Sequence, residues 1–173
     1  SRLPAYQRTR RGIARGFQIP RPFSSMSVLE NLVVPLEYVV HRGSLHTADT
    51  RAEAMAILRD IGLAGKADTP SNRLTQVEQR KLELARAMAA KPKLLISDEA
   101  MAGLSTSEVD DILALLLGLK AQGVAVVMIE HIMRAVMKFS ERVAVLVAGR
   151  KIADGEPAAI AANTDVIKAY LGE

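Results

Sequence analysis

The chain has 173 residues and a formal net charge of +4, and 49% of its residues are hydrophobic. A sequence of this length and composition can bury one core, so a disordered chain is excluded and a single domain is expected. The sequence has no cysteine, which excludes disulfides, a thiol nucleophile and Cys-based metal sites, and three scattered histidines exclude a His-rich metal cage.

We expect neither a membrane span nor a secretory leader in this sequence. No uninterrupted apolar run approaches the roughly 18 residues that a spanning helix needs, and the basic start lacks the apolar stretch of a signal peptide. We therefore expect a cytoplasmic chain. Six of the 23 basic residues lie in the first 21 positions: Arg2, Arg8, Arg10, Arg11, Arg15 and Arg21. This cluster fits a nucleic-acid or lipid patch or a solvated face, and because aromatic residues are scarce we expect no nucleic-acid partner.

The first half of the chain is predicted to be helical after an irregular segment over residues 1–23. Ser27 and Glu30 have the spacing of a capping box, and Pro35 is expected to interrupt the helix that they start. Apolar residues at spacings of three and four define the later helices. The predicted elements are a helix over 28–33, a helix over 47–62, turns over 64–73 and a helix over 77–90.

The second half alternates apolar strands with helices. The predicted elements are a strand over 94–97, a helix over 107–122, a strand over 124–129, a helix over 132–139, a strand over 142–148 with its hairpin partner over 151–154, and short helices over 157–162 and 165–171. Continuous apolar strands that alternate with helices are typical of a parallel sheet. The fold class predicted is α/β, with a mostly parallel sheet, a helical subdomain inserted before it, and a C-terminal hairpin with short helices.

Two of the predicted strands end in ionisable residues, Asp98-Glu99 and Glu130-His131. Ligands of open parallel sheets bind beyond the carboxyl ends of the strands, so we expect these side chains to gather at one edge. Nucleotide hydrolases place an aspartate near Mg²⁺ in this way, and a neighbouring Glu99 is suited to polarise a water that His131 helps to orient. The alternative interpretation is that Asp98 caps the following turn and His131 is structural.

The order of these segments resembles the ATP-binding subunit of an ABC transporter, and more narrowly that of the branched-chain amino-acid (Liv-type) importers. The resemblance is carried by GFQIPRPFSSMSVLENL (16–32), QRKLELARAM (79–88), LLISDEAMAGLS (94–105), IEH (129–131) and ADGEPAAIAANTDVIKAYLGE (153–173). It implies a P-loop NTPase-like domain in four parts: a Q-loop region (1–23), a helical subdomain (24–91), a Walker B and switch lobe (92–155) and a C-terminal extension (156–173).

The resemblance also implies the roles of individual residues. Asp98 and Gln18 would hold Mg²⁺, Glu99 would act as the general base, and His131 would be the switch residue. The implied nucleotide-binding residues are Gln18, Thr75, Gln76, Val77, Glu78 and Ser105. ATP and Mg²⁺ are the implied cofactors. The implied partners are membrane permease subunits and a second ATP-binding subunit in a head-to-tail dimer, at the inner face of the plasma membrane.

The sequence departs from the family pattern in two places. No segment matches the phosphate-binding loop G-x-x-x-x-G-K-[ST], so we expect a domain that lacks its N-terminal part. In the signature segment LTQVEQ (74–79), Val77 stands where glycine is expected and Glu78 adds negative charge. We therefore expect weak ATP binding and hydrolysis by the isolated chain, and an incomplete sheet that leads to self-association or marginal stability. The alternative is a non-catalytic module that docks on a permease or on a complete ATPase. Arg80 and Lys81 are predicted to be surface charges.

Overall fold

The structure is a computed structural model that describes residues 3–41 and 47–171. Its contacts divide the chain into two compact units, Ser1–Ile129 and Glu130–Glu173. The four-part division implied by the family resemblance stays a prediction. Within the described residues, no helix combines the length and the apolar character that a membrane crossing requires.

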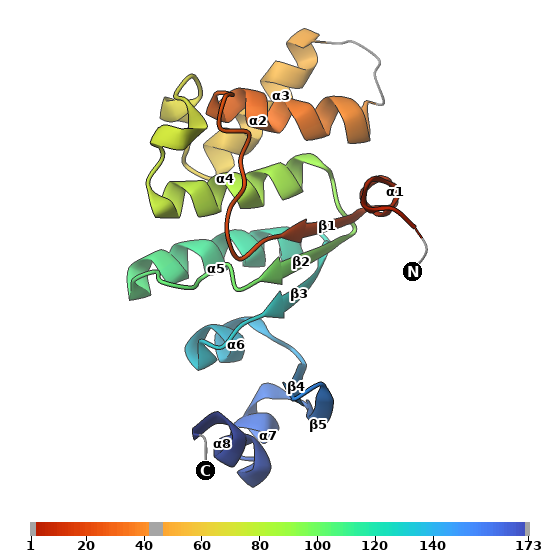
Figure 1. Ribbon diagram of the computed structural model, residues 1–173, viewed down its shortest axis with the longest axis vertical. Coiled ribbons are helices and arrows are strands. Elements are labelled where there is room, and N and C mark those ends of the chain that lie inside the picture. Colours follow the sequence, from red (N-terminus) through yellow and green to blue (C-terminus); the bar gives the residue numbers. More distant parts are fainter. Residues whose placement is uncertain (1–2, 42–46, 172–173) are drawn as a thin grey trace. The chain divides into compact units, whose positions relative to one another are not determined.

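The first unit contains a parallel sheet of three strands in the order β1-β2-β3 (Figure 1). The strands are β1 (Ile13–Gly16), β2 (Leu94–Asp98) and β3 (Ala125–Ile129). The parallel pairing of β2 with β3 confirms the α/β prediction. Strand β1 and the preceding helix α1 (Ala5–Arg10) were not predicted, because the sequence IARG gives a strand of four residues with no continuous apolar run.

The helices between β1 and β2 form a separate group above the sheet in Figure 1. They are α2 (Val28–Pro35), the π-helical turn η1 (Leu36–Val40), α3 (Thr47–Asp60), the 3₁₀ turns η2 (Ala64–Lys66) and η3 (Ser71–Arg73), and α4 (Gln76–Ala89). The predicted capping box is confirmed, since Ser27 Oγ accepts from the N–H of Glu30 (3.2 Å) and Glu30 Oε2 accepts from the N–H of Ser27 (2.7 Å). Helix α2 ends at Pro35, as predicted, but the chain does not leave the helical path there. The chain continues past it with wider hydrogen bonds, such as the N–H of His41 to the C=O of Leu36 (2.9 Å).

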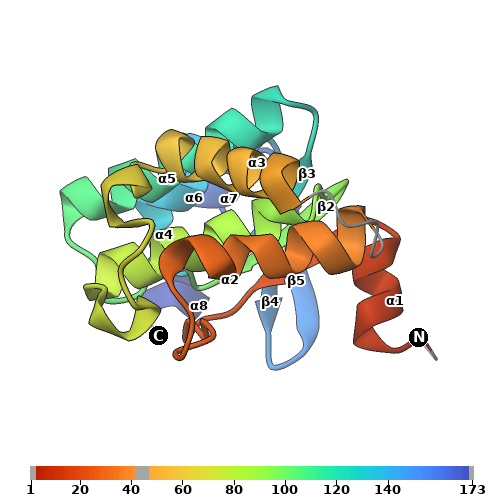
Figure 2. The same cartoon turned by 90° about the horizontal axis from the view of Figure 1, so that it is seen from above.

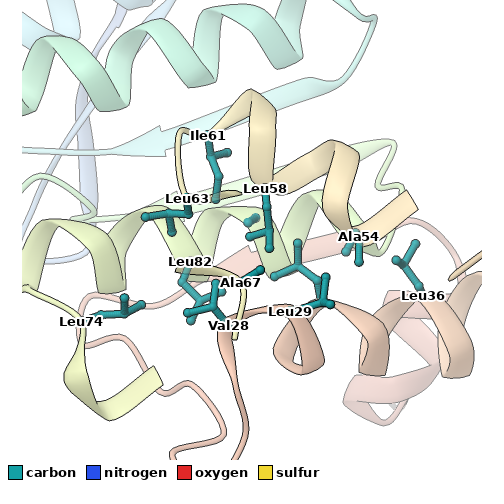
Figure 3. Packing of buried hydrophobic residues seen from close by; sticks show 13 residues of the cluster. Val28, Leu29, Leu36, Ala54, Leu58, Ile61, Leu63, Ala67, Leu74 and Leu82 are labelled. Atoms are coloured by element: carbon teal, nitrogen blue, oxygen red, sulfur yellow. The ribbon is translucent and has the colours of Figure 1, made fainter. Parts of the chain in front are cut away.

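Helices α2, α3 and α4 enclose a hydrophobic core of their own, each packing against the other two (Figures 2 and 3). The amphipathic pattern of the sequence predicts this packing, because apolar residues recur on one face of each helix. The buried cluster comprises Val28, Leu29, Leu32, Leu36, Ala54, Leu58, Ile61, Leu63, Ala67, Leu74, Leu82, Ala85 and Ala89. The helical group therefore has its own buried core, against which the loop between β1 and α2 can pack.

The two faces of the sheet differ in exposure. One face buries Ala14, Leu95 and Ser97, and helix α5 (Thr106–Ala121) packs against strand β3. On the other face the alternate side chains are more exposed: Ile13 is 36%, Val127 50% and Ile129 47% exposed. The strand register places Arg15 opposite Ile96, and Asp98 lies two residues further along β2. Arg15 and Asp98 therefore lie on this more exposed face, as diagonal neighbours.

Gly12 makes the turn between α1 and β1, and its conformation suits only glycine. Its φ is +88°, and a Cβ at this position would lie 3.0 Å from Cγ of Lys93. We expect Gly12→Ala to lower the free energy of unfolding by about 1–2 kcal/mol, because an L-residue is strained in this region. Gly118→Ala in α5 is the matched control. It meets nothing within 4 Å and should raise the free energy of unfolding by about 0.5–1 kcal/mol. Urea unfolding followed by circular dichroism measures both, and equal effects would contradict the assignment.

The second unit is a β-hairpin with three short helices. Its elements are α6 (Met133–Phe139), β4 (Val143–Val147), β5 (Arg150–Gly155), α7 (Pro157–Ala161) and α8 (Thr164–Leu171). The predicted hairpin is confirmed, because β4 and β5 pair antiparallel. Its two-residue turn has φ of 47° at Ala148 and 78° at Gly149, which is the conformation that matches the twist of the paired strands.

Asp154 on β5 forms ion pairs with two basic residues, Arg142 and Lys151. Arg142 donates to both of its carboxylate oxygens (2.7 and 3.1 Å) and Lys151 donates to one (2.7 Å). Hydrogen bonding to Arg142, and then to Lys151, lowers the pKa of Asp154 from its ordinary value of 3.8 to about 2.

We expect the carboxylate of Asp154 to titrate near pH 2 in an NMR titration, and at a higher pH that is still below 3.8 once Arg142 is replaced by Gln, because the contact with Lys151 remains. Because the folded-state pKa is lowered, the pair stabilises the hairpin above pH 3.8, and this contribution is lost as the pH falls through about 2. Arg150→Gln removes the same charge from the same hairpin and should leave the midpoint near 2. A midpoint near 3.8 in the unaltered chain would contradict the ion pair.

Candidate nucleotide site

The acidic pair Asp98-Glu99 lies at the carboxyl end of β2. Asp98 is the last residue of the strand and pairs in register with Ile129, the last residue of β3. Glu99 has a φ of +47°, and its N–H donates to the C=O of Ile129 (2.9 Å). This confirms that the carboxyl ends of the two predicted strands meet at one edge of the sheet.

Arg15 of β1 contacts the first of these acids. Its Nη2 lies 2.6 Å from Oδ2 of Asp98, with the two side chains 54% and 23% exposed. The guanidinium also lies over the ring of Phe17, 5.3 Å from its centre. The sequence placed Arg15 only in a basic cluster, because nothing local marks a partner 83 residues away.

Gln18 contacts the second acid. Its Nε2 donates to Oε2 of Glu99 (2.5 Å). The backbone C=O of Gln18 accepts from Nη1 of Arg80 on α4. Arg80 is only 8% exposed, so the prediction that it is a surface charge is wrong. Its guanidinium is directed inward because it holds the loop that follows β1, rather than facing solvent.

The rest of this loop is also fastened to the helical group, alongside α4 as Figure 1 shows. Arg86 donates to the C=O of Arg21 (2.8 Å) and lies 4.6 Å from the ring centre of Phe23. The fully buried Asn31 accepts from the N–H of Phe23 (2.8 Å) and donates to its C=O (3.2 Å). Ser71 Oγ donates to the same C=O (2.9 Å). The segment 18–23 is therefore held at three points by α2, α4 and η3.

The signature segment begins helix α4 with a second capping box. Thr75 Oγ1 accepts from the N–H of Glu78 (3.3 Å), and Glu78 Oε2 accepts from the N–H of Thr75 (3.0 Å). Lys66 Nζ lies 2.5 Å from Glu78 Oε1, and hydrogen bonding to Lys66 is the main cause that lowers the pKa of Glu78. Both residues thus have structural roles at the N-terminus of α4. The charge of Glu78 is balanced by Lys66.

The other predicted nucleotide-binding residues lie near this helix start or at the next one. Gln76 is exposed, and its side-chain amide lies beside Gly103 in the turn that follows the acidic pair. A Cβ added to Gly103 would be 3.4 Å from Nε2 of Gln76. Val77 is half-buried in the first turn of α4. Ser105 caps α5, where its N–H donates to Glu108 Oε2 (2.7 Å).

His131 belongs to the second unit and is exposed there. Its backbone C=O accepts from the hydroxyl of Tyr170 (3.3 Å). The approach of its imidazole to Asp98 and Glu99 stays a prediction from the sequence.

The donor atoms at the sheet edge suit Mg²⁺ in type. Asp98 supplies a carboxylate, and Gln18 supplies an amide whose nitrogen is used toward Glu99, so that its oxygen is the end available to a cation. Mg²⁺ in nucleotide sites takes one or two such protein ligands and completes its shell with water and phosphate oxygens. Within residues 3–41 and 47–171, no group of three or more His, Cys, Asp or Glu residues could hold a metal by itself. Asp98 and Gln18 therefore supply the one or two protein ligands that Mg²⁺ takes in such sites.

Two family profiles match the sequence. The profile described as "ABC transporter" matches residues 2–102, and that described as "Branched-chain amino acid ATP-binding cassette transporter" matches residues 150–173. The chain belongs to the ABC transporter family.

The chain is similar over almost its whole length to ATP-binding proteins of known transport systems. It is 38% identical over 183 residues to the "High-affinity branched-chain amino acid transport ATP-binding protein BraF" of Pseudomonas aeruginosa, covering 99% of this chain and 72% of that protein. The likeness to LivG of Escherichia coli K12, which has the same description, is 38% over 185 residues with the same coverage. A third relative, the "Lipopolysaccharide export system ATP-binding protein LptB" of Haemophilus influenzae, is 32% identical and is covered to 70%.

Solved structures of ATP-binding cassettes have the same fold. The ADP conformation of MJ1267, an ATP-binding cassette of an ABC transporter, matches with a TM-score of 0.83 at 26% identity, over 100% of this chain and 73% of that one. A dimeric post-hydrolysis state of the cassette MJ0796 bound to ADP and Pi matches with a TM-score of 0.80 at 25% identity, over 90% and 68%. These likenesses confirm the predicted fold class.

Proposed function

We propose that this chain is the ATP-binding subunit of an importer for branched-chain amino acids or similar solutes, acting at the cytoplasmic face of a membrane permease. The observation that carries the proposal is the contact of Gln18 with Glu99 beside Asp98 at the carboxyl edge of the sheet. The description of BraF and LivG as branched-chain amino acid transport ATP-binding proteins supports the choice of solute.

In the proposed mechanism each residue at the sheet edge has a separate task. Asp98 and the amide oxygen of Gln18 would hold Mg²⁺, which when bound neutralises phosphate charge and polarises the transferred phosphoryl group. Glu99 would accept a proton from the attacking water, and its hydrogen bond with Gln18 orients the carboxylate for this step. His131 would hydrogen-bond the terminal phosphate. The proposed tasks fit the acceptor chemistry of the carboxylates and the donor chemistry of the amide.

The signature segment would face a nucleotide held by a second ATP-binding subunit in a head-to-tail dimer. The residues assigned to it are Thr75, Gln76, Val77 and Glu78, with Ser105 from the neighbouring turn. The dimeric cassette MJ0796 supports this arrangement for the family. The branched side chain at Val77 would keep the backbone from approaching the phosphate as closely as glycine allows.

We further propose that the 173-residue chain alone binds and hydrolyses ATP weakly. Its sequence contains no G-x-x-x-x-G-K-[ST] segment, whose backbone N–H groups and lysine would hold the phosphates. The alternative is a non-catalytic module that docks on a permease or on a complete ATPase. Thr75 and Glu78 form the cap of helix α4, and Glu78 is also paired with Lys66. These contacts give both residues a structural task, which favours the alternative.

A nucleotide titration combined with an ATPase assay tests these proposals. We expect weak Mg²⁺-ATP binding by the unaltered chain and tighter binding by Val77→Gly once a complete ATP-binding subunit is added, because glycine restores the backbone approach. Glu99→Gln should bind like the unaltered chain and show no turnover. Micromolar affinity and Mg²⁺-dependent turnover of the chain alone, abolished by Glu99→Gln, would contradict weak activity.

Co-purification with a branched-chain amino-acid permease in detergent tests the docking itself. We expect the unaltered chain and Glu99→Gln to be retained equally without nucleotide. Retention of both, together with no turnover when a complete ATPase is present, would favour the non-catalytic module. No retention of either would contradict the importer assignment.

A further inference from the structure

Each acid at the end of β2 is contacted by a side chain from the end of β1. Glu99 accepts from the neutral amide of Gln18 (2.5 Å), whereas Asp98 is paired with the permanently charged guanidinium of Arg15 (2.6 Å). The two contacts therefore differ in their effect on a cation. A neutral amide leaves the charge of its carboxylate in place, while a guanidinium cancels it.

The strand register makes the second contact a consequence of the sheet itself. Arg15 pairs with Ile96, so Asp98 is its diagonal neighbour on the same face. Side chains in this relation are within reach when one of them is long. The Arg15 side chain is 54% exposed, and it also lies 5.3 Å from the ring centre of Phe17. This ring gives the guanidinium a contact that does not depend on Asp98.

We propose that Arg15 is an internal counter-ion of Asp98 that sets the affinity of this carboxylate for a divalent cation. The inference rests on the proposed function, which assigns Asp98 to the metal. A divalent cation bound to Oδ2 at the usual Mg²⁺–oxygen distance would lie next to Nη2 of Arg15, so like charges would repel and the ion pair must open first. Arg15 thus competes with the cation for the negative charge of Asp98.

The competition can be measured without nucleotide and without turnover. Mn²⁺ serves as the probe, because its free concentration is read directly by electron paramagnetic resonance during a titration of the full chain. We expect Arg15→Gln to bind Mn²⁺ about two- to fivefold more tightly than the unaltered chain, which is the size of effect expected from a partly exposed ion pair. Arg59→Gln on α3 removes the same charge from an exposed position and should leave the affinity within the error of the titration.

A double-mutant cycle separates this inference from the function on which it rests. Asp98→Asn should weaken Mn²⁺ binding, and Arg15→Gln should have no further effect in the Asp98→Asn background. Circular dichroism spectra that match the unaltered chain establish that every variant is folded.

If Asp98→Asn weakens binding but Arg15→Gln has no more effect than Arg59→Gln, the counter-ion inference is overturned while the metal assignment stands. If Asp98→Asn leaves binding unchanged, or if no protein-bound Mn²⁺ is found in any variant, the metal assignment fails and the inference fails with it.

Discussion

Leu82→Ala should lower the free energy of unfolding by about 2–5 kcal/mol, the range found when a fully buried leucine is truncated. Leu82 is 0% exposed and lies in the cluster that α2, α3 and α4 enclose (Figure 3). Three helices surround the site, so no single shift of one element can fill the space that the missing methyl groups leave. Urea unfolding followed by helical circular dichroism gives the change, read from the midpoint at constant slope.

Ile19→Ala is the matched control for this prediction. Ile19 belongs to the same unit, is similar in size to leucine and is 67% exposed, so its truncation should change the free energy of unfolding by no more than about 0.5 kcal/mol. A loss below about 1 kcal/mol for Leu82→Ala, or equal losses for both variants, would mean that the helical group is not packed as described.

Asn31→Ala should lower the free energy of unfolding by about 2–4 kcal/mol, since three hydrogen bonds of about 0.5–1.5 kcal/mol each are lost. Asn31 is fully buried and bonds with the N–H and C=O of Phe23 and with the C=O of Ser27 (2.9 Å). Its loss leaves the N–H of Phe23 without this acceptor. We therefore also expect the amide of Phe23 to exchange its hydrogen faster, as measured by NMR.

Asn72→Ala provides the comparison for Asn31→Ala, because Asn72 in η3 is exposed and its truncation should be nearly neutral. The free energy of unfolding and the amide exchange of Phe23 report on different contacts of Asn31. A stability loss without faster exchange at Phe23 would show that Asn31 supports the core alone, which contradicts its role in holding segment 18–23.

The sequence alone predicted the elements whose residues interact with near neighbours in the chain. The capping box at Ser27 and Glu30, the continuous apolar strands β2 and β3, and the hairpin of β4 and β5 were all predicted and are confirmed. Their causes are interactions between residues close in the chain, such as a side chain that accepts from a backbone N–H three residues away.

The features that were missed depend on residues far apart in the chain. Strand β1 is identified by its pairing with β2, which lies about 80 residues later, rather than by its own four residues. Arg80 looks like a solvated helix charge in sequence, but its partner is a backbone carbonyl 62 residues away. A backbone carbonyl leaves no mark in a sequence, so neither this contact nor the ion pair of Arg15 with Asp98 could be predicted from residue types.

The way in which segment 18–23 is held has a consequence for the chemistry at the sheet edge. Gln18 is tied at its side chain to Glu99 and at its backbone to α4, while Phe23 is tied to α2 and η3. Any rotation of these helices relative to the strands must therefore either stretch the amide–carboxylate contact or carry Gln18 away with it. The orientation of the Glu99 carboxylate thus depends on the position of these helices, although no helix residue contacts that carboxylate in the contacts described above.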